Sequence, residues 1–88
     1  MDVSTTPIAE RIARVLAGER LSANAQGEEE SAGAHVDAVW REHLPEALAV
    51  LRTLREPDRA MADAGDVAIW EKMVRAAIEG SKPQTVVL

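Results

Sequence analysis

The sequence predicts an all-α fold, a small bundle of three to five helices. Sixteen of its residues are alanine, while phenylalanine and tyrosine are absent, so the core must be thin and aliphatic. Alanine is the strongest helix former, whereas sheets favour aromatic and β-branched pairs. Apolar residues recur at helical spacing in three segments, and proline and glycine punctuate the second half of the chain like helix ends.

Length, cysteine content and charge limit the range of functions. The 88 residues suffice for one domain, 1–88, and a chain this short buries only about 60–65% of its unfolded surface. The absence of cysteine excludes disulfides and cysteine-based metal sites and fits a cytoplasmic location. The net charge of −5 disfavours binding to nucleic acid or anionic lipid. No apolar run approaches the about 20 residues of a membrane span, so we expect no membrane contact.

The first predicted helix covers 7–17. Thr6 and Pro7 are favoured as N-cap and first helical residue, and residues 1–5 before them are typical of a frayed end. One apolar stripe predicts the inward face of this helix: Ile8, Ile12, Val15 and Leu16. Leu21 falls off the stripe, so we place the helix end near Gly18.

Residues 18–34 are predicted to form a flexible loop. They are rich in glycine and polar residues, include three consecutive glutamates, Glu28 to Glu30, and offer only Leu21 as an anchor. The glutamates could form a patch for a cation or a basic partner. Three adjacent carboxylates do not converge without a fixed backbone, so we interpret the segment as a solvated linker.

The longest predicted helix spans 36–55. Its apolar stripe consists of Val36, Trp40, Leu44, Ala47, Leu48, Leu51 and Leu54. Pro45 lies on the polar side of this stripe and leaves two outcomes open. The unbroken phase favours one helix bent at Pro45, whereas the missing N–H of proline and its steric effect on Leu44 favour two helices that meet there.

Two short helices are predicted in series over 57–64 and 66–79. Pro57 is expected in the first turn of the former, with Met61 and Ala64 facing inward, and Gly65 is expected to end it in a left-handed conformation. Asp66 should open the second helix and Gly80 should end it. Its inward stripe is Val67, Trp70, Met73, Val74, Ala77 and Ile78. The tail, 81–88, is expected to fray.

No catalytic, cofactor-binding or metal-binding residue is predicted. His35 and His43 are about 12 Å apart along a helix, whereas histidines that share a metal are spaced three or four residues apart. A site that combines His43 with Glu42 or Glu46 is the alternative to ordinary packing at the stripe's margin. No serine lies in a nucleophile motif and no phosphate-binding loop occurs, so we do not expect an enzyme.

Two sets of residues are candidate interaction sites. The first is a stripe of core or interaction residues: Trp40, Leu44, Leu48, Leu51, Trp70, Met73 and Val74. Core packing is the simpler interpretation because each tryptophan lies centrally on its apolar side, and the alternative is that one stripe is left over for a second chain. The second is a weak basic cluster of Arg52, Arg55 and Arg59. Acidic residues are interleaved with these arginines, which favours surface ion pairs over DNA contact.

The second half of the chain also carries a distinctive arrangement of residues. They are Trp40, then Ala47-Leu48-Ala49-Val50-Leu51, Arg55-Glu56-Pro57-x-x-Ala60-Met61, Ala64-Gly65 and Trp70-x-x-Met73-Val74-x-Ala76-Ala77-Ile78. Over 40–78 this pattern resembles that of small uncharacterised helical proteins of alphaproteobacteria and their phages or prophages, with Asp58-Arg59 in place of the Thr-Glu typical of them. The resemblance implies a helical fold and a bacterial or phage setting. It implies no activity and no catalytic residue.

These observations predict a non-enzymatic interaction or structural module without a cofactor. Its partner is expected to be a protein or a second copy of the chain, because a dimer would supplement the thin core. The alternative is a small regulator of the phage or prophage type that acts on a nucleic-acid-associated partner.

Overall fold

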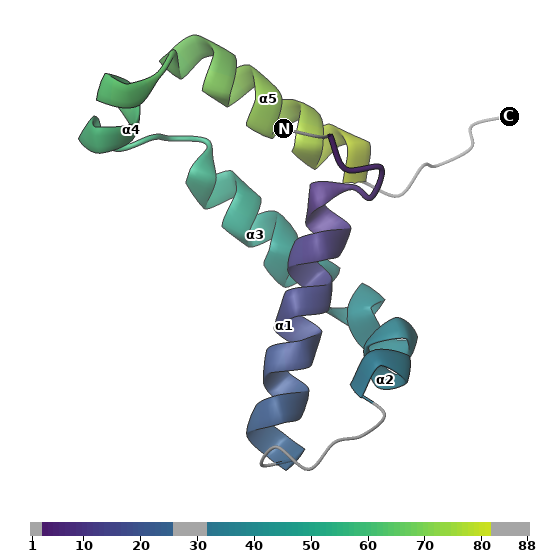
Figure 1. Ribbon diagram of the computed structural model, residues 1–88. Coiled ribbons are helices and arrows are strands. Elements are labelled where there is room, and N and C mark those ends of the chain that lie inside the picture. Colours follow the sequence, from purple (N-terminus) through teal and green to yellow (C-terminus); the bar gives the residue numbers. More distant parts are fainter. Residues whose placement is uncertain (1–2, 26–31, 82–88) are drawn as a thin grey trace, which may run out of the picture.

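The computed structural model describes residues 3–25 and 32–81, and these ranges form helices and short connections (Figure 1). In chain order the elements are α1 (Ile8–Ala25), α2 (Ala32–Val39), the 3₁₀ turn η1 (Trp40–His43), α3 (Leu44–Leu54), α4 (Arg59–Ala64) and α5 (Val67–Ser81). No strand occurs in the described ranges, so the predicted all-α fold class is confirmed. Within them, no helix has the length and apolar character needed to cross a bilayer.

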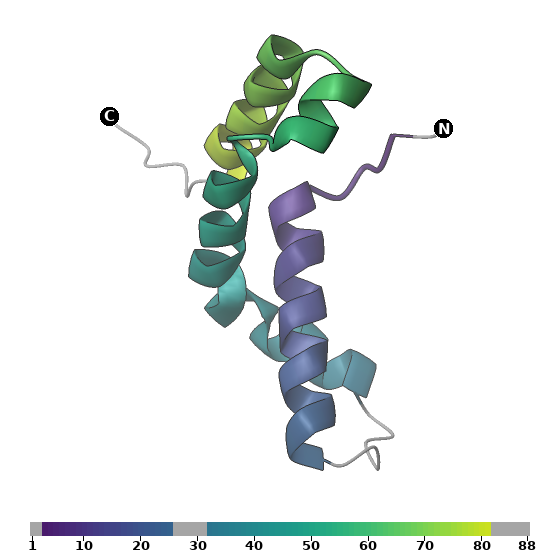
Figure 2. The same ribbon diagram turned by 90° about the vertical axis from the view of Figure 1, so that its left-hand side faces the viewer.

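α1 contacts α2, η1, α3 and α5, whereas α4 lies away from it at the far end of α3 and α5 (Figures 1 and 2). α2 and η1 pack against its C-terminal half, and α3 crosses it. α4 then turns the chain, so that α5 returns alongside α3 and reaches the N-terminal half of α1. In Figure 2, α3 lies on one side of α1, while α2 emerges on the other side beside the lower half of α1.

The buried face of α1 consists of alanine. Its members Ala9, Ala13 and Ala17 are at most 1% exposed. The inward stripe predicted for this helix is therefore wrong in part, because Ile8, Ile12 and Leu16 are only half-buried and Val15 is 62% exposed. Alanines four residues apart lie on one face of a helix, and their small size lets α3 and η1 approach α1 closely.

The core has two small clusters along α1. The first, from α1, α3 and α5, contains Ala9, Leu51, Val74 and Ile78. The second, from α1, η1 and α3, contains Ala13, Ala17, Trp40 and Ala47. Ile12 and Leu44 pack against both clusters and connect them. Among the described residues only alanines are less than 2% exposed, so the core is as thin as the composition predicts.

α1 continues well past its predicted end. It reaches Ala25 and α2 begins at Ala32, so the loop predicted over 18–34 is wrong at both ends. The cause is tertiary packing: a Cβ on Gly18 would lie 3.9 Å from the Val36 side chain, which places α2 directly against this part of α1. The middle of the predicted loop, 26–31, lies outside the described residues, and so does the glutamate run within it.

The chain forms two helices, not one bent helix, around Pro45. α2 ends at Val39, η1 makes a tighter turn, and α3 begins at Leu44 with Pro45 in its first turn. The second of the two predicted outcomes is therefore correct. The N–H groups of a first helical turn have no helical acceptor, so proline loses no hydrogen bond in this position.

Aspartates cap the N-termini of α4 and α5. The Asp58 carboxylate accepts a hydrogen bond from the Met61 N–H at 3.0 Å, and the Asp66 carboxylate accepts one from the Ile69 N–H at 3.1 Å. The prediction for Asp66 is confirmed. The prediction that Pro57 lies in the first turn of α4 is wrong, because the Asp58 cap places the helix start at Arg59.

Neither of the two predicted glycine ends holds in full. Gly65 follows the last residue of α4, but its φ of −161° and ψ of −161° are extended and not left-handed. Gly80 lies inside α5, which continues to Ser81. The Ser81 hydroxyl donates a hydrogen bond to the Ala77 carbonyl at 2.8 Å, which stabilises this last turn. The remainder of the predicted tail, 82–88, lies outside the described residues.

The molecule is open for its size. Its radius of gyration is 15.6 Å, whereas a compact chain of this length has about 12 Å. Its accessible surface is 6918 Å², compared with about 5000 Å² for a compact protein of this mass. α4 contributes to this openness because none of its residues is buried, and the inward positions predicted for Met61 and Ala64 are wrong.

Candidate functional site

An apolar groove lies between α3 and α5 and is bordered by α1. Its volume is about 510 Å³. The lining is apolar throughout: Ile8, Ile12, Val50, Leu51, Leu54, Trp70, Met73, Val74 and Ala77. Met73 is 64% exposed and Val50 is 41% exposed, so this groove opens to water through large apolar side chains.

A second groove, of about 440 Å³, adjoins the first along α1. It adds Arg11, Val15 and Leu16, and it shares Ile8, Ile12 and Val50 with the first groove. We call the combined lining of the two grooves the apolar face. Among the described residues that line this face, Arg11 carries the only charged side chain.

The apolar face exists because three helices carry more apolar residues than their contacts cover. α1 uses its alanine stripe for the core, which leaves Val15 in water. α5 buries Val74 and leaves Met73, and α3 buries Leu51 and leaves Val50. Contiguous apolar surface of this kind is typical of a site that another protein surface covers.

Most residues of the predicted core or interaction stripe belong to the core, and one belongs to the apolar face. The core members of the stripe, buried or half-buried in the two clusters, are Trp40, Leu44, Leu48, Leu51, Trp70 and Val74. The Trp70 Nε1–H donates a hydrogen bond to the Leu54 carbonyl at 2.6 Å and so joins α5 to α3. Met73 belongs to the apolar face, and its predicted inward position is wrong.

Sequence reasoning missed the exposed members of the apolar face on α1 and α3. Val15 was assigned to an inward stripe, and Val50 was given no position on its helix; both are exposed. Periodicity identifies the apolar side of a helix without showing how much of it a neighbour covers. The second, alanine-only stripe on α1 is the signal that could have revealed an uncovered side.

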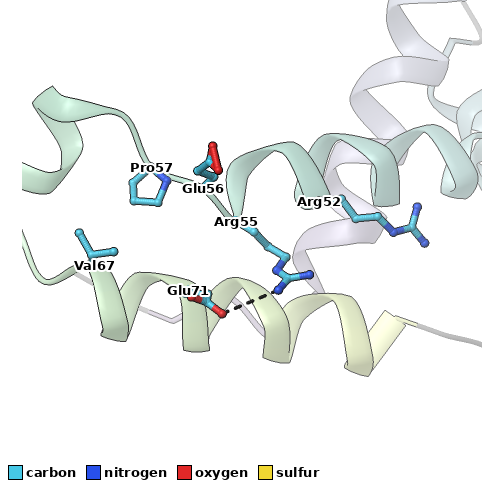
Figure 3. A pocket seen from close by; sticks show the side chains of 6 residues that line it. All are labelled: Arg52, Arg55, Glu56, Pro57, Val67 and Glu71. Atoms are coloured by element: carbon cyan, nitrogen blue, oxygen red, sulfur yellow. Dashed lines mark ion pairs between the residues drawn. The ribbon is translucent and has the colours of Figure 1, made fainter.

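A polar pocket of about 390 Å³ lies where α3 leads towards α4 and α5 (Figure 3). Its lining consists of Arg52, Arg55, Glu56, Pro57, Val67 and Glu71. Arg55 reaches Glu71 across the pocket at 3.7 Å, while Arg52 extends along α3 away from this pair (Figure 3). Glu71 also pairs with Arg75 at 2.7 Å, so the carboxylate of Glu71 balances charge from two arginines.

The predicted basic cluster therefore does not form a positive surface. Arg52 and Arg55 share their pocket with two glutamates. Arg59 lies on α4, outside this pocket, and pairs with Asp63 at 3.9 Å. Because the three guanidinium groups do not converge, the arrangement provides no common site for a phosphate.

The two histidines are also separate. The His43 Nδ1 lies 2.9 Å from Glu46, whose other oxygen accepts a hydrogen bond from Arg20 at 2.9 Å, so this cluster joins α1 to α3. His35 is exposed on α2. The described residues contain no group of three or more potential ligands that could hold a metal ion.

Trp40 is enclosed by two arginines. The guanidinium carbons of Arg14 and Arg41 lie 5.2 Å and 4.5 Å from its ring centroid, within the range of cation–π attraction. Arg14 donates hydrogen bonds to Asp37 and to Glu10. The bond to Asp37 has the larger effect and the bond to Glu10 the smaller one, and both raise the pKa of Arg14 above its ordinary value. The contacts of Arg14 connect α1 to α2, so this cluster has a structural role.

Comparisons with protein-family models, with curated proteins and with solved structures find no match. The resemblance noted over 40–78 stays a prediction. The apolar face is the described feature that bears most directly on function.

Proposed function

We propose that this chain is a non-enzymatic interaction module that self-associates through the apolar face. The observation that carries the proposal is the continuity of the two grooves, which place Ile12, Val15, Val50 and Met73 on one uncovered surface. Covering such a surface removes apolar area from water, which is the main driving force for protein association.

The exposed side chains of the face support a second copy as the occupant. Val15, Val50 and Met73 are 62%, 41% and 64% exposed, so each copy offers large apolar side chains that the same face of another copy would cover.

The shape of the apolar face also supports self-association. The face combines recesses with exposed side chains such as Met73, so exposed side chains of one copy can fill recesses of another. Two chains of net charge −5 repel each other at long range, but the near absence of charge on this face lets them meet there.

Sedimentation equilibrium of the wild-type chain and two variants tests the proposal. We expect the wild-type chain to dimerise at micromolar concentration, and Val15→Asp and Met73→Asp to be monomeric. Each variant places a carboxylate without a partner inside the proposed interface, where the loss of its hydration is unfavourable.

Val67→Asp is the matched control. Val67 is also exposed, at 43%, but it lies at the start of α5 outside the apolar face, where a carboxylate suits a helix N-terminus. This variant should dimerise like the wild-type chain. A wild-type chain that is monomeric at every concentration measured would contradict the proposal.

A further inference from the structure

We propose that the second copy binds with its α1 antiparallel to the α1 of the first, across a two-fold axis at Val15. Arg11 of each copy then pairs with Glu19 of the other. This inference rests on the proposed self-association and adds the orientation, the register and the charged residues that fix them.

The three residues lie in one row on the exposed side of α1. Arg11, Val15 and Glu19 are spaced by four, so each follows the previous one after about one helical turn. All three are exposed, and Arg11 and Val15 line the apolar face.

Neither charge at the ends of this row has an ion-pair partner among the described residues. The other two arginines of α1 differ in this respect, because Arg14 pairs with Glu10 and Arg20 pairs with Glu46. Arg11 and Glu19 are eight residues apart, which is too far for a pair on their own helix. Their charges are therefore available to a second chain.

A two-fold axis at Val15 brings these opposite charges together. In an antiparallel pair, residues equally distant from the axis face each other, so Arg11 faces Glu19 of the other copy and the contact occurs twice. A parallel arrangement in the same register would place Arg11 against Arg11. The row thus favours one orientation over the other.

A residue pair beside this row fits the same register. Seven positions from the axis, Ile8 faces Ser22 of the other copy. The isoleucine meets a small residue there, which allows the two helices to approach closely. The occupant that satisfies both the charges and the sizes is another α1.

A charge-swap series measured by sedimentation equilibrium tests the register. Arg11→Glu and Glu19→Arg each replace two attractive contacts with two repulsive ones, so we expect each single variant to weaken the dimer by about tenfold or more. The double variant R11E/E19R restores opposite charges and should recover the wild-type dissociation constant within about threefold. Salt should reduce the effect of the single variants.

Arg59→Glu is the matched control for charge reversal. Arg59 lies on α4, outside the apolar face, and its side chain is 87% exposed. Its reversal should leave the dimer unchanged. Circular dichroism of every variant checks that the helices are retained.

A cysteine cross-link gives a second, independent measurement. The chain contains no cysteine, so Val15→Cys introduces a single thiol at the proposed axis, where it meets its own copy. We expect mild oxidation to join the V15C dimer through a disulfide, which requires Cα atoms within about 7 Å. Arg59→Cys should not form this link at the same protein concentration.

The outcomes separate this inference from the proposed function. A monomeric wild-type chain overturns both. A wild-type dimer with unaffected single variants, or with a double variant no tighter than the singles and no V15C link, overturns the antiparallel register while self-association stands. Weakened single variants, a recovered double variant and a V15C link together support it.

Discussion

Gly18 is predicted to end a helix from its local sequence, but it lies inside a helix in the folded protein. A glycine followed by polar residues predicts a helix end, because glycine readily adopts the conformation found just past the last turn. In the structure it lies within α1, beside Val36 of α2. Its value here is its small size at a contact between two helices.

Gly18→Ala should stabilise the protein. Alanine is favoured over glycine inside a helix by about 1 kcal/mol, and the new Cβ would lie 3.9 Å from Val36, at ordinary contact distance. We expect urea denaturation to show a free energy of unfolding raised by about 0.5–1 kcal/mol. Gly80→Ala, in the last turn of α5, should have a smaller effect. A loss of stability in Gly18→Ala would show that α1 ends near 18, as the sequence alone suggests.

The alanine stripe governs the fold at the scale of the elements. Ala9, Ala13 and Ala17 form the contact between α1 and its neighbours, while the larger apolar residues of α1 lie beside it or face away. Alanines are weak evidence for a buried face in a sequence, because alanine favours the helix whether or not its side chain is buried. The isoleucine stripe therefore dominated the prediction.

Ala13→Leu should destabilise the fold. Ala13 has no exposed surface, so a larger side chain can be placed there only by moving α1 away from η1 and α3. Thermal or urea denaturation should show a loss of about 1–3 kcal/mol. Ala68→Leu, the same change at an exposed position of α5, should alter stability by no more than about 0.5 kcal/mol. Equal effects of the two variants would mean that α1 does not pack through its alanines.

Local signals predicted where some helices begin better than they predicted which side of each helix is buried. Capping and the effect of proline are local, so the Asp66 cap and a break at Pro45 could both be derived from the chain itself. The continuation of α1 to Ala25 could not, because it depends on the contact with α2 and on the Arg20–Glu46 pair. From the sequence, the apolar face could be anticipated only as an apolar stripe that the core does not need. Which side chains line it follows from the tertiary arrangement.

The whole molecule combines two small core clusters with a large uncovered apolar face. Its surface is larger and its radius of gyration higher than those of a compact chain of the same length. A fold with so little buried area has a small free energy of unfolding on its own. Association through the apolar face would therefore contribute a substantial part of its stability.

The midpoint of thermal unfolding should accordingly rise with protein concentration. Self-association favours the folded chain by mass action, so the wild-type midpoint, followed by circular dichroism, should increase over a hundredfold range of concentration. The midpoint of the monomeric variant Val15→Asp should be lower and independent of concentration. A wild-type midpoint that does not change would contradict a stabilising dimer.

The alanine contacts of α1 also influence the entropy of folding. Alanine has no side-chain torsion to restrict, so its burial loses no rotamer freedom, whereas a buried methionine or glutamine loses up to about 2 kcal/mol. A chain without disulfides thus forms its central helix crossing at a low entropic cost. The same lack of torsions means that the crossing cannot adjust by exchanging rotamers, and α1 and α3 are restricted to a single close spacing.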